Sequence, residues 1–254
     1  MDKYQEVQRL YDNPYLYEIE FKDYHDDMYF WPQIVQGYNS KNLLEIGCGI
    51  GRVAKLVAPV VEKYTGLDFS KEFIDYFKEK EKKFINQYNI SLINQDMKKI
   101  HINEKYDMII LPFNVFVYLY TDEDIKNFFL GLEKVCSKNT IIIIDLTNNQ
   151  EEDFINIDYR LCNEINDLNN RKIKLYEKHT YDEENKIIYY SKKYISDDEK
   201  QEVILNLPVK VYTVDDFVRF AKQYNYKFEI VYGDYDKSDY SKNSRKQIIV
   251  LKKR

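Results

Sequence analysis

The sequence predicts an α/β fold: a doubly wound, mostly parallel seven-stranded sheet with an inserted antiparallel sheet. Short apolar runs alternate with helical patterns as far as Asp145, and a glycine-rich turn follows the first of these runs. Beyond Arg171, strand patterns follow one another with only turn residues between them. Alternating strands and helices are typical of a parallel sheet, whereas consecutive strands indicate hairpins.

Residues 1–40 show no strand pattern and are crowded with aromatic side chains. Within them, Phe21 to Val35 has a helical pattern. This helix is expected to end near Gly37, because glycine and the polar residues after it stop helices. We therefore expect residues 1–40 to form a helical segment of their own before the first strand.

Five apolar runs of strand length follow, separated by helical patterns. Ser70 is expected to cap a helix that runs to about Asn86, and Thr121 to cap another, because their hydroxyls accept the free N–H groups of a first helical turn. The helix after the glycine-rich turn is expected at Gly51–Val60. The expected strands are Leu43–Ile46, Tyr64–Leu67, Ile90–Ile93, Tyr106–Leu111 and Thr140–Asp145.

The pattern changes after the fifth strand, where strand-like stretches are separated by acidic, turn-rich segments, as in successive hairpins. A helix at Thr213–Tyr224 follows them. We expect one domain at residues 41–156 and 212–254, with residues 157–211 inserted as an antiparallel lid. The strand-like stretches of the lid are Arg171–Tyr181, Lys186–Ile195 and Gln201–Val211, and the closing strands of the domain are Phe228–Val231 and Gln247–Leu251.

Composition limits the partners and the compartment. The 254 residues carry a formal net charge of −5, so no general field draws the chain to nucleic acid or to an anionic membrane. The three cysteines lack a C-x-x-C spacing, which argues against a disulfide framework and a zinc site. There is no signal-peptide layout, and no apolar run approaches the ~20 residues of a membrane span. We therefore expect a cytoplasmic protein without a metal.

The glycine-rich turn carries the strongest functional signal. Gly47, Gly49 and Gly51 stand at alternate positions between a strand and a helix, where backbone without side chains can approach a ligand closely. Asp68 lies 21 residues after the first glycine, about where a nucleotide-binding unit delivers a carboxylate to a ribose. Glu45 precedes the turn, and a carboxylate there repels a diphosphate but suits a cationic ligand. The spacing also departs from the dinucleotide pattern G-x-G-x-x-G.

This pattern resembles class I S-adenosylmethionine-dependent methyltransferases, in which an acid opens the glycine loop and a second acid ends the second strand. The resemblance implies a Rossmann-like fold and S-adenosylmethionine as cofactor. It also implies that Glu45 binds the cofactor's ammonium group, that Asp68 binds the ribose hydroxyls, and that Asp96 lies at the adenine amino group. Asp96 has an alternative interpretation as an acid of a plain turn. The implied cofactor-binding residues are Glu45, Gly47, Gly49, Gly51, Arg52, Asp68, Phe69, Asp96 and Met97.

Two further stretches resemble small-molecule N-methyltransferases, such as those for glycine or amino-deoxysugars. They are Leu10–Tyr17 and Val231–Tyr235. The resemblance implies that residues 1–40 fold over the cofactor as a cap and that the methyl acceptor is a small molecule. The edges of the lid sheet are able to pair in a homodimer, although a monomer fits as well.

The catalytic candidates come from the N-terminal segment and from the end of the fourth strand. Tyr11 and Tyr15, together with Tyr118, are candidates for shaping the methyl channel. His25 is a candidate general base, because histidine exchanges protons near neutral pH; the alternative is a surface histidine. Asn114 is a candidate for binding cofactor or substrate, and its alternative is a hydrogen bond to local backbone.

The favoured function is transfer of a methyl group from S-adenosylmethionine to a small-molecule amine. The alternatives are O-methylation of a small metabolite, methylation of RNA or protein, and a non-catalytic S-adenosylmethionine-binding module. Leu111–Asn114 departs from the acid-or-Asn, Pro, Pro, aromatic pattern of enzymes that methylate amino groups in nucleic acid. Since the chain also has no basic block beyond Lys252–Arg254, we expect neither a nucleic-acid nor a membrane partner.

Overall fold

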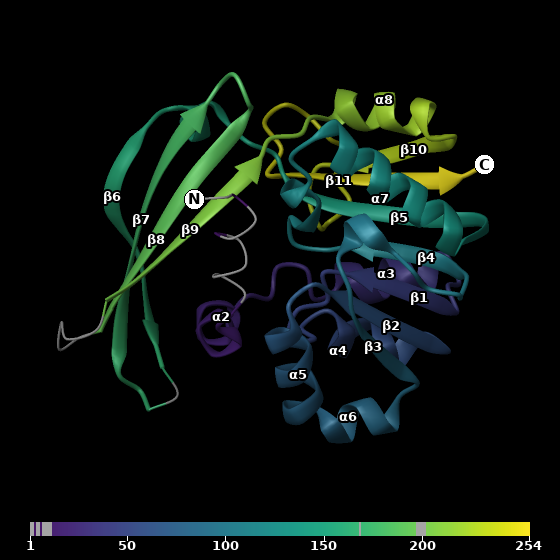
Figure 1. The fold of residues 1–254 in the computed structure, drawn as a ribbon, viewed down its shortest axis with the longest axis horizontal. Helices are drawn as coiled ribbons and strands as arrows, with labels where there is room; N and C mark the ends of the chain where they lie inside the picture. Colours follow the sequence, from purple (N-terminus) through teal and green to yellow (C-terminus); the bar gives the residue numbers. More distant parts are fainter. Residues whose placement is uncertain (1–2, 4–5, 7–11, 168, 197–201) are drawn as a thin grey trace. The chain divides into compact units, whose positions relative to one another are not determined.

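The computed structural model describes the chain except for residues 1–2, 4–5, 7–11, 168 and 197–201. The chain forms two compact units, whose elements are labelled in Figure 1. The smaller unit comprises Met1–Tyr24 and Asn149–Val211, and the larger unit comprises His25–Asn148 and Tyr212–Arg254. Residues 25–40 therefore lie in the larger unit, whereas the sequence prediction grouped residues 1–40 as one segment.

The larger unit is built on a seven-stranded sheet with the strand order β10-β11-β5-β4-β1-β2-β3. Strands β1 to β5 pair in parallel with one another, and β11 runs antiparallel to both β5 and β10. The predicted doubly wound, mostly parallel sheet is thus confirmed. Its strands are β1 (Asn42–Ile46), β2 (Lys63–Asp68), β3 (Ile90–Asn94), β4 (Tyr106–Leu111), β5 (Cys136–Thr147), β10 (Tyr226–Tyr232) and β11 (Lys246–Lys253).

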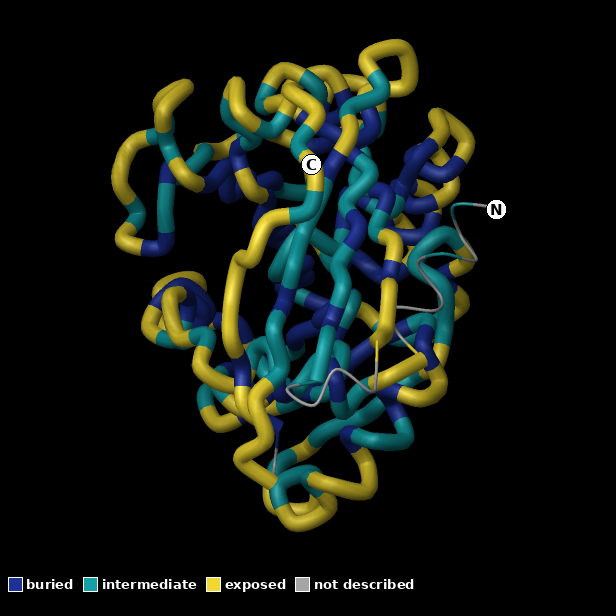
Figure 2. The backbone as a smooth tube through the Cα atoms, turned by 90° about the vertical axis from the view of Figure 1, so that its left-hand side faces the viewer, coloured by how far each residue is buried: buried dark blue, intermediate teal, exposed yellow. Residues whose placement is uncertain are grey.

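The central strands of this sheet are buried, as their continuous apolar runs require. Met108 to Leu111 of β4 and Ile142 to Ile144 of β5 have no exposed surface, whereas the edge strands β3 and β10 are partly exposed. Figure 2 shows the backbone coloured by burial, with buried segments in dark blue and exposed ones in yellow. Among the helices that the structure describes, none is long and apolar enough to cross a membrane. The helices of the larger unit are α3 (Phe30–Gly37), α4 (Ala54–Val57), α5 (Lys71–Lys80), α6 (Lys82–Gln87), α7 (Asp122–Val135) and α8 (Val214–Gln223).

Three helices of the larger unit begin where the sequence predicts. Ser70 caps α5, and Thr121 and Thr213 form capping boxes with Asp124 and Asp216 at the starts of α7 and α8. In each box the hydroxyl accepts a backbone N–H and the carboxylate accepts the N–H of the capping residue. These short-range hydrogen bonds explain why the three helix starts are readable from the sequence.

Two other helices differ from the prediction. The first is short, because α4 continues as a 3₁₀ turn, Ala58–Val60. Gly51 has a φ of +84°, so it cannot be the first residue of the helix, and Pro59 lacks the N–H that would extend the α-helix. The helix predicted from Ser70 to about Asn86 is divided at Glu81 into α5 and α6.

The predicted helix from Phe21 to Val35 is wrong. Instead, α2 (Pro14–Phe21) belongs to the smaller unit and α3 to the larger, with turns between them. Helix α2 begins where Asn13 accepts the N–H of Leu16 at 3.0 Å. Before α3, the buried carboxylate of Asp27 pairs with Arg52. This tertiary contact fixes the turn and is not visible in the helical pattern.

The smaller unit contains a four-stranded antiparallel sheet, in the order β6-β7-β8-β9. It confirms the predicted inserted antiparallel sheet and adds one strand that the sequence did not predict, β6. Most residues of β6 are exposed. Apolar and polar residues alternate only from Ile157 to Leu161, and the register with β7 shifts between Leu161 and Asn163, so the strand pattern is too short to stand out. The strands are β6 (Ile157–Asn166), β7 (Lys172–Asp182), β8 (Ile187–Ser196) and β9 (Glu202–Lys210).

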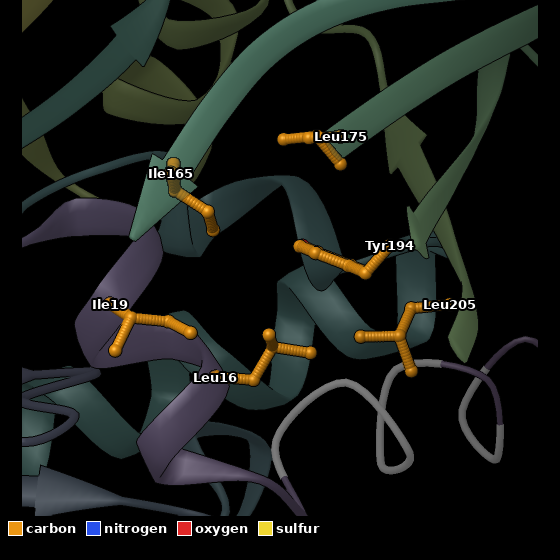
Figure 3. Packing of buried hydrophobic residues seen from close by; sticks show 6 residues of the cluster. All are labelled: Leu16, Ile19, Ile165, Leu175, Tyr194 and Leu205. Carbon is orange, nitrogen blue, oxygen red and sulfur yellow. The ribbon is translucent and has the colours of Figure 1, made fainter. Parts of the chain in front are cut away.

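Helix α2 packs on this sheet within the smaller unit. Its buried side chains Leu16 and Ile19 face residues from all four strands (Figure 3). Beside this cluster, Glu20 of α2 accepts a hydrogen bond from Lys192 at 2.5 Å. The buried apolar contacts and this ion pair together hold α2 on the sheet. The strand residues of the cluster are Ile165, Leu175, Tyr194 and Leu205.

Candidate functional site

The glycine loop after β1 is folded tightly against its neighbours. Gly47, Gly49 and Gly51 have φ values of +76°, +54° and +84°, which side chains disfavour. A Cβ at Gly47 would overlap Val115, and a Cβ at Gly51 would overlap Phe77. The alternate glycines therefore leave backbone, rather than side chains, at the carboxyl end of β1.

Asp68 at the end of β2 is fixed by backbone donors on both sides. Its Oδ2 accepts the N–H of Gly49 at 2.8 Å, and its Oδ1 accepts the N–H of Ser70 at 2.9 Å. Burial raises the pKa of Asp68 to about 6, although these N–H groups favour the ionised form. The loop and the acid that the sequence singled out are thus joined by a direct hydrogen bond.

Glu45 of β1 is 2 % exposed and stands two residues before the first glycine of the loop. Its Oε2 accepts the hydroxyl hydrogen of Tyr64 at 2.7 Å. Burial raises the pKa of Glu45 to about 8, against the lowering effects of Tyr64 and Arg52. A cation that binds beside this carboxyl group favours its ionised form, so Glu45 is suited to a positively charged ligand.

Arg52, which follows the loop, is held by a carboxylate from the turn before α3. Its guanidinium makes two hydrogen bonds to Asp27, at 2.6 and 2.9 Å. Asp27 is fully buried and also accepts the indole N–H of Trp31 at 2.9 Å. The guanidinium carbon lies 5.1 Å from the ring centre of Phe113. Arg52 thus connects the glycine loop to α3 and to the segment after β4.

The remaining cofactor candidates follow β2 and β3. The sheet register pairs Asp68 with Asn94, which brings Phe69, Asp96 and Met97 to the same edge of the sheet. Asp96 caps a 3₁₀ turn, with its Oδ1 accepting the N–H of Lys98 at 2.8 Å. Phe69 and Met97 are half-buried. The structure therefore gathers the cofactor candidates around the carboxyl ends of β1, β2 and β3, where ligands bind in such sheets.

The catalytic candidates are more scattered. Tyr11 lies outside the described residues, and Tyr15 packs against the apolar cluster of the smaller unit. His25 is exposed, in the turn before α3. Asn114 lies at the carboxyl end of β4, where its side chain makes two hydrogen bonds to Thr147, at 2.6 and 3.1 Å. Thr147 is 33 residues away, so these bonds are not the local backbone contact of the alternative interpretation, and a role for Asn114 in binding stays a prediction.

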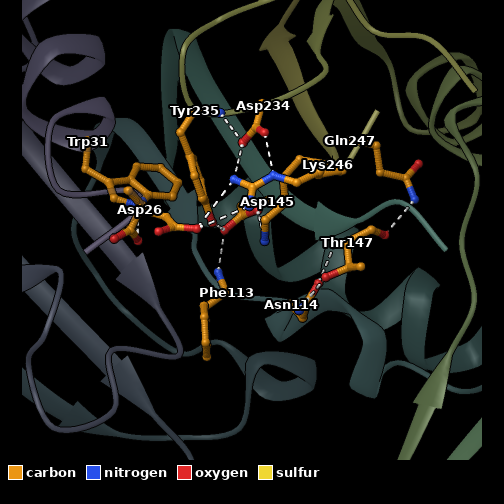
Figure 4. A network of polar contacts seen from close by, with 12 residues as sticks. Asp26, Trp31, Phe113, Asn114, Asp145, Thr147, Asp234, Tyr235, Lys246 and Gln247 are labelled. Atoms are coloured by element: carbon orange, nitrogen blue, oxygen red, sulfur yellow. Dashed lines mark hydrogen bonds and ion pairs between the residues drawn. The ribbon is translucent and has the colours of Figure 1, made fainter. Parts of the chain in front are cut away.

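Sequence reasoning missed an acidic residue at the carboxyl end of β5. Asp145 is fully buried, and its Oδ2 accepts the hydroxyl hydrogen of Tyr235 at 2.7 Å (Figure 4). The ammonium group of Lys246 lies 3.2 Å from Oδ1. The available signal was an acid that directly follows the run Ile141–Ile144. Its partners could not have been read, because they stand far away in the sequence.

Within the described part of the chain, no group of three or more His, Cys, Asp or Glu side chains is arranged to hold a metal ion. The site is instead made of glycine backbone, buried carboxylates and aromatic rings. Residues 43–139, which run from β1 into β5, match the family model described as a methyltransferase domain. This part of the chain is a methyltransferase domain.

Solved structures share the fold of the methyltransferase domain and its insertion. An S-adenosylmethionine-dependent methyltransferase from Clostridium acetobutylicum ATCC 824 is 15% identical, with a TM-score of 0.77 and 99% of each chain covered. The amino pentose methyltransferase CalS10 from Micromonospora echinaspora is 13% identical, with a TM-score of 0.74, covering 94% of this chain and 95% of that one. The sugar N-methyltransferase KedS8 from Streptoalloteichus sp ATCC 53650 is 11% identical, with a TM-score of 0.75, covering 94% and 91%.

No match was found among curated protein sequences. At the identities of the solved structures, the likeness concerns the fold. The match to a methyltransferase domain supports the predicted methyltransferase class over residues 43–139, and the solved structures confirm the predicted fold. The acceptor is a separate question.

Proposed function

We propose that the protein transfers a methyl group from S-adenosylmethionine to the amine nitrogen of a small-molecule acceptor. The observation that carries the proposal is a pair of buried carboxyl groups, Glu45 and Asp68, at the glycine loop of a methyltransferase domain. A donor with a sulfonium and an ammonium group suits these acids. A nucleotide diphosphate does not, because both acids would repel it.

The residues around the loop fit the cofactor in chemical terms. Each carboxylate oxygen accepts more than one hydrogen bond, so Asp68 keeps capacity for ribose hydroxyls beside its two backbone donors. Glu45 supplies negative charge for the ammonium group. The ring of Phe69 supplies an apolar surface for adenine. The proposed cofactor-binding residues are those of the sequence prediction: Glu45, Gly47, Gly49, Gly51, Arg52, Asp68, Phe69, Asp96 and Met97.

When bound, S-adenosylmethionine supplies a methyl group already activated by its sulfonium. The protein therefore has to position the acceptor and exclude water rather than activate the donor. An amine that arrives neutral needs no general base, whereas a hydroxyl has to lose its proton during attack. Tyr11, Tyr15, His25 and Asn114 stay predictions for the acceptor side, and a role for His25 as a base is needed only for a hydroxyl acceptor.

The nature of the acceptor is supported by the similar structures and by charge. Two of them are described as an amino pentose methyltransferase and a sugar N-methyltransferase, and both are covered over nine tenths of their length. The net charge of −5 gives no general attraction for RNA. Both observations favour a small amine over a macromolecule.

The experiment has a donor arm and an acceptor arm. Calorimetry with S-adenosylmethionine and S-adenosylhomocysteine tests the donor, with NAD as the competing ligand. Transfer of a radiolabelled methyl group is then followed with a panel of amino sugars and small amines, their hydroxyl analogues, total RNA and protein. We expect label in an amino compound and not in its hydroxyl analogue. Binding of NAD alone, or label only in RNA or protein, would contradict the proposal.

We also propose that the smaller unit forms a homodimer through its sheet. The strands β6 and β9 stand at the two ends of that sheet, and edge strands offer unpaired N–H and carbonyl groups. Light scattering on the full chain measures the mass in solution. A monomer at all concentrations tested would contradict this part of the proposal.

A further inference from the structure

The segment after β4 has an unusual backbone. Phe113 and Asn114 have φ values of +59° and +65°. Both are in the left-handed region, which asparagine tolerates and phenylalanine disfavours. Two such residues in succession persist only where the surroundings hold them, and conformations of this kind gather at functional sites.

The end of β5 supplies the contacts that hold this segment. The N–H of Phe113 donates to Oδ2 of Asp145 at 2.8 Å, and the N–H of Asn114 donates to the carbonyl oxygen of Asp145 at 3.0 Å. The side chain of Asn114 adds two hydrogen bonds to Thr147. One residue, Asp145, thus binds both left-handed residues, the first through its side chain and the second through its backbone.

The carboxylate of Asp145 is itself held by the C-terminal hairpin. The hydroxyl group of Tyr235 and the N–H of Phe113 both donate to Oδ2, from opposite sides in Figure 4. Lys246 of β11 lies 3.2 Å from Oδ1 and 5.1 Å from the ring centre of Tyr235. Asp145 has no exposed surface, so water does not compete for these bonds. The carboxyl group of Asp145 is therefore fixed in orientation.

Phe113 also contacts Arg52, the residue that follows the glycine loop. The ring of Phe113 lies 5.1 Å from the guanidinium carbon of Arg52. Arg52 makes two hydrogen bonds to Asp27, which accepts the indole N–H of Trp31. A continuous set of contacts therefore runs from Asp145 to the residue that follows the glycines.

We propose that Asp145 is a positioning residue, which holds Phe113 and Asn114 left-handed and thereby fixes the ring of Phe113 against Arg52. The ring then forms a fixed wall at the boundary between the glycine loop and the end of β4, where the acceptor has to meet the donor. The link to methyl transfer rests on the proposed function. The positioning of Phe113 by Asp145 does not.

The test compares two aspartate variants of the full chain. Asp145→Asn removes the negative charge and replaces one carboxylate oxygen with an NH2 group, which must face either Lys246 or the two donors that now bind Oδ2. Asp107→Asn is the matched control, because Asp107 accepts the N–H groups of Lys41 and Asn42 near the other end of β4. Amide hydrogen exchange is measured by NMR at Phe113 and Asn114, together with the fluorescence of the sole tryptophan.

In Asp145→Asn we expect both amides to exchange about 100-fold faster or more, and the emission of Trp31 to shift. In Asp107→Asn, neither readout should change. The Asn114 amide is decisive, because its acceptor is a backbone carbonyl that the substitution leaves in place. Unchanged exchange at Asn114 and unchanged emission in folded Asp145→Asn would overturn the proposal. If Asp145→Asn does not fold, Tyr235→Phe takes its place. Faster amide exchange and shifted emission are then expected, and unchanged exchange at Asn114 together with unchanged emission would overturn the proposal.

A third readout connects the positioning to the reaction. S-adenosylhomocysteine should bind Asp145→Asn within about threefold of the unmodified protein, since Glu45 and Asp68 are untouched, while methyl transfer falls at least tenfold. Undiminished transfer by Asp145→Asn would overturn the role in catalysis. Absence of transfer in the unmodified protein would instead contradict the proposed function, and amide exchange would still decide whether Asp145 positions Phe113.

Discussion

Two carboxylates at the carboxyl edge of the large sheet, Asp68 and Asp145, are held in opposite ways. Asp68 accepts backbone N–H groups of Gly49 and Ser70, at sequence separations of 19 and 2 residues. Asp145 accepts from Phe113 and Tyr235, at separations of 32 and 90 residues. The first carboxylate is fixed by the chain around the glycine loop, and the second by side chains and backbone from distant strands.

Under the proposed function, this difference is expected where one sheet edge serves a constant cofactor and a variable acceptor. A site made from backbone donors and glycines tolerates few changes, because every one of its contacts depends on the path of the chain. A site made from side chains such as Tyr235 and Lys246 is open to single substitutions. The first arrangement suits a cofactor, and the second suits an acceptor that differs between enzymes of one fold.

The largest effect is expected from removing the carboxylate of Asp68, the one that backbone N–H groups hold. Asp68→Ala should weaken S-adenosylhomocysteine binding about 100-fold or more, because two hydrogen bonds to a charged group are lost at once. Calorimetry measures the affinity. The control is Asp107→Ala, which removes a carboxylate of similar backbone contacts far from the loop and should leave the affinity unchanged. An Asp68→Ala protein that binds with full affinity would remove Asp68 from the cofactor site.

The pH dependence of stability separates Glu45 from Asp68. The folded pKa of Glu45 is about 8, above its ordinary value of 4.5. Between these two pH values the folded protein holds a proton that the unfolded chain has lost, so the free energy of unfolding falls as pH rises from about 4.5 to 8. The folded pKa of Asp68 is about 6, above its ordinary 3.8. The loss of stability that Asp68 causes as pH rises therefore takes place mainly between about pH 3.8 and 6. Between pH 6 and 8 the loss should therefore report Glu45, at about 1.4 kcal/mol per pH unit or less.

Denaturant unfolding without ligand at pH 6, 7 and 8 measures this slope. Glu45→Gln keeps an acceptor for the hydroxyl group of Tyr64 and should flatten the slope between pH 6 and 8. Asp68→Asn should leave it nearly unchanged there. Equal slopes for the unmodified protein and Glu45→Gln would show that Glu45 does not titrate in this window.

A glycine substitution tests whether the glycine loop beside Asp68 depends on having backbone without side chains. Gly47→Ala places a methyl group in the space of Val115 at a φ of +76°, and we expect a loss of about 2–4 kcal/mol in the free energy of unfolding. Gly37→Ala is the matched control at the end of α3, where a Cβ meets no atom within 4 Å. Equal stability of the two variants would contradict the tight packing of the loop.

The two halves also differ in how far the sequence predicts them. The glycines and Asp68 follow each other at a spacing set by one strand–helix–strand unit, so their meeting could be foreseen. The apolar run Tyr106–Leu111 similarly defines β4 without ambiguity. In contrast, Asp145 lies beside Tyr235 because β11 pairs antiparallel with β5. Nothing near Asp145 in the sequence shows which residues of the C-terminal hairpin reach it.

Tertiary contacts explain the other departures as well. The helix predicted across His25 stops because Asp27 pairs with Arg52, 25 residues away. Strand β6 escaped prediction because its residues are mostly exposed and are held by backbone pairing to β7. Local signals such as capping boxes and apolar runs therefore predict where elements begin. They do not predict which polar side chains the fold brings together.

The smallest effect is expected from removing the hydroxyl group of Tyr235, which donates to the carboxylate of Asp145. Tyr235→Phe removes one buried hydrogen bond to the carboxylate of Asp145, and a loss of about 1–2 kcal/mol in the free energy of unfolding is expected. Tyr240→Phe is the matched control, because its hydroxyl donates to Asn148 across a longer 3.3 Å at a part-buried position, and about 0.5 kcal/mol or less is expected there. Denaturant unfolding compares the two. If both tyrosines cost the same, Asp145 does not depend on the hairpin, and the contrast between a backbone-held and a side-chain-held carboxylate would no longer stand.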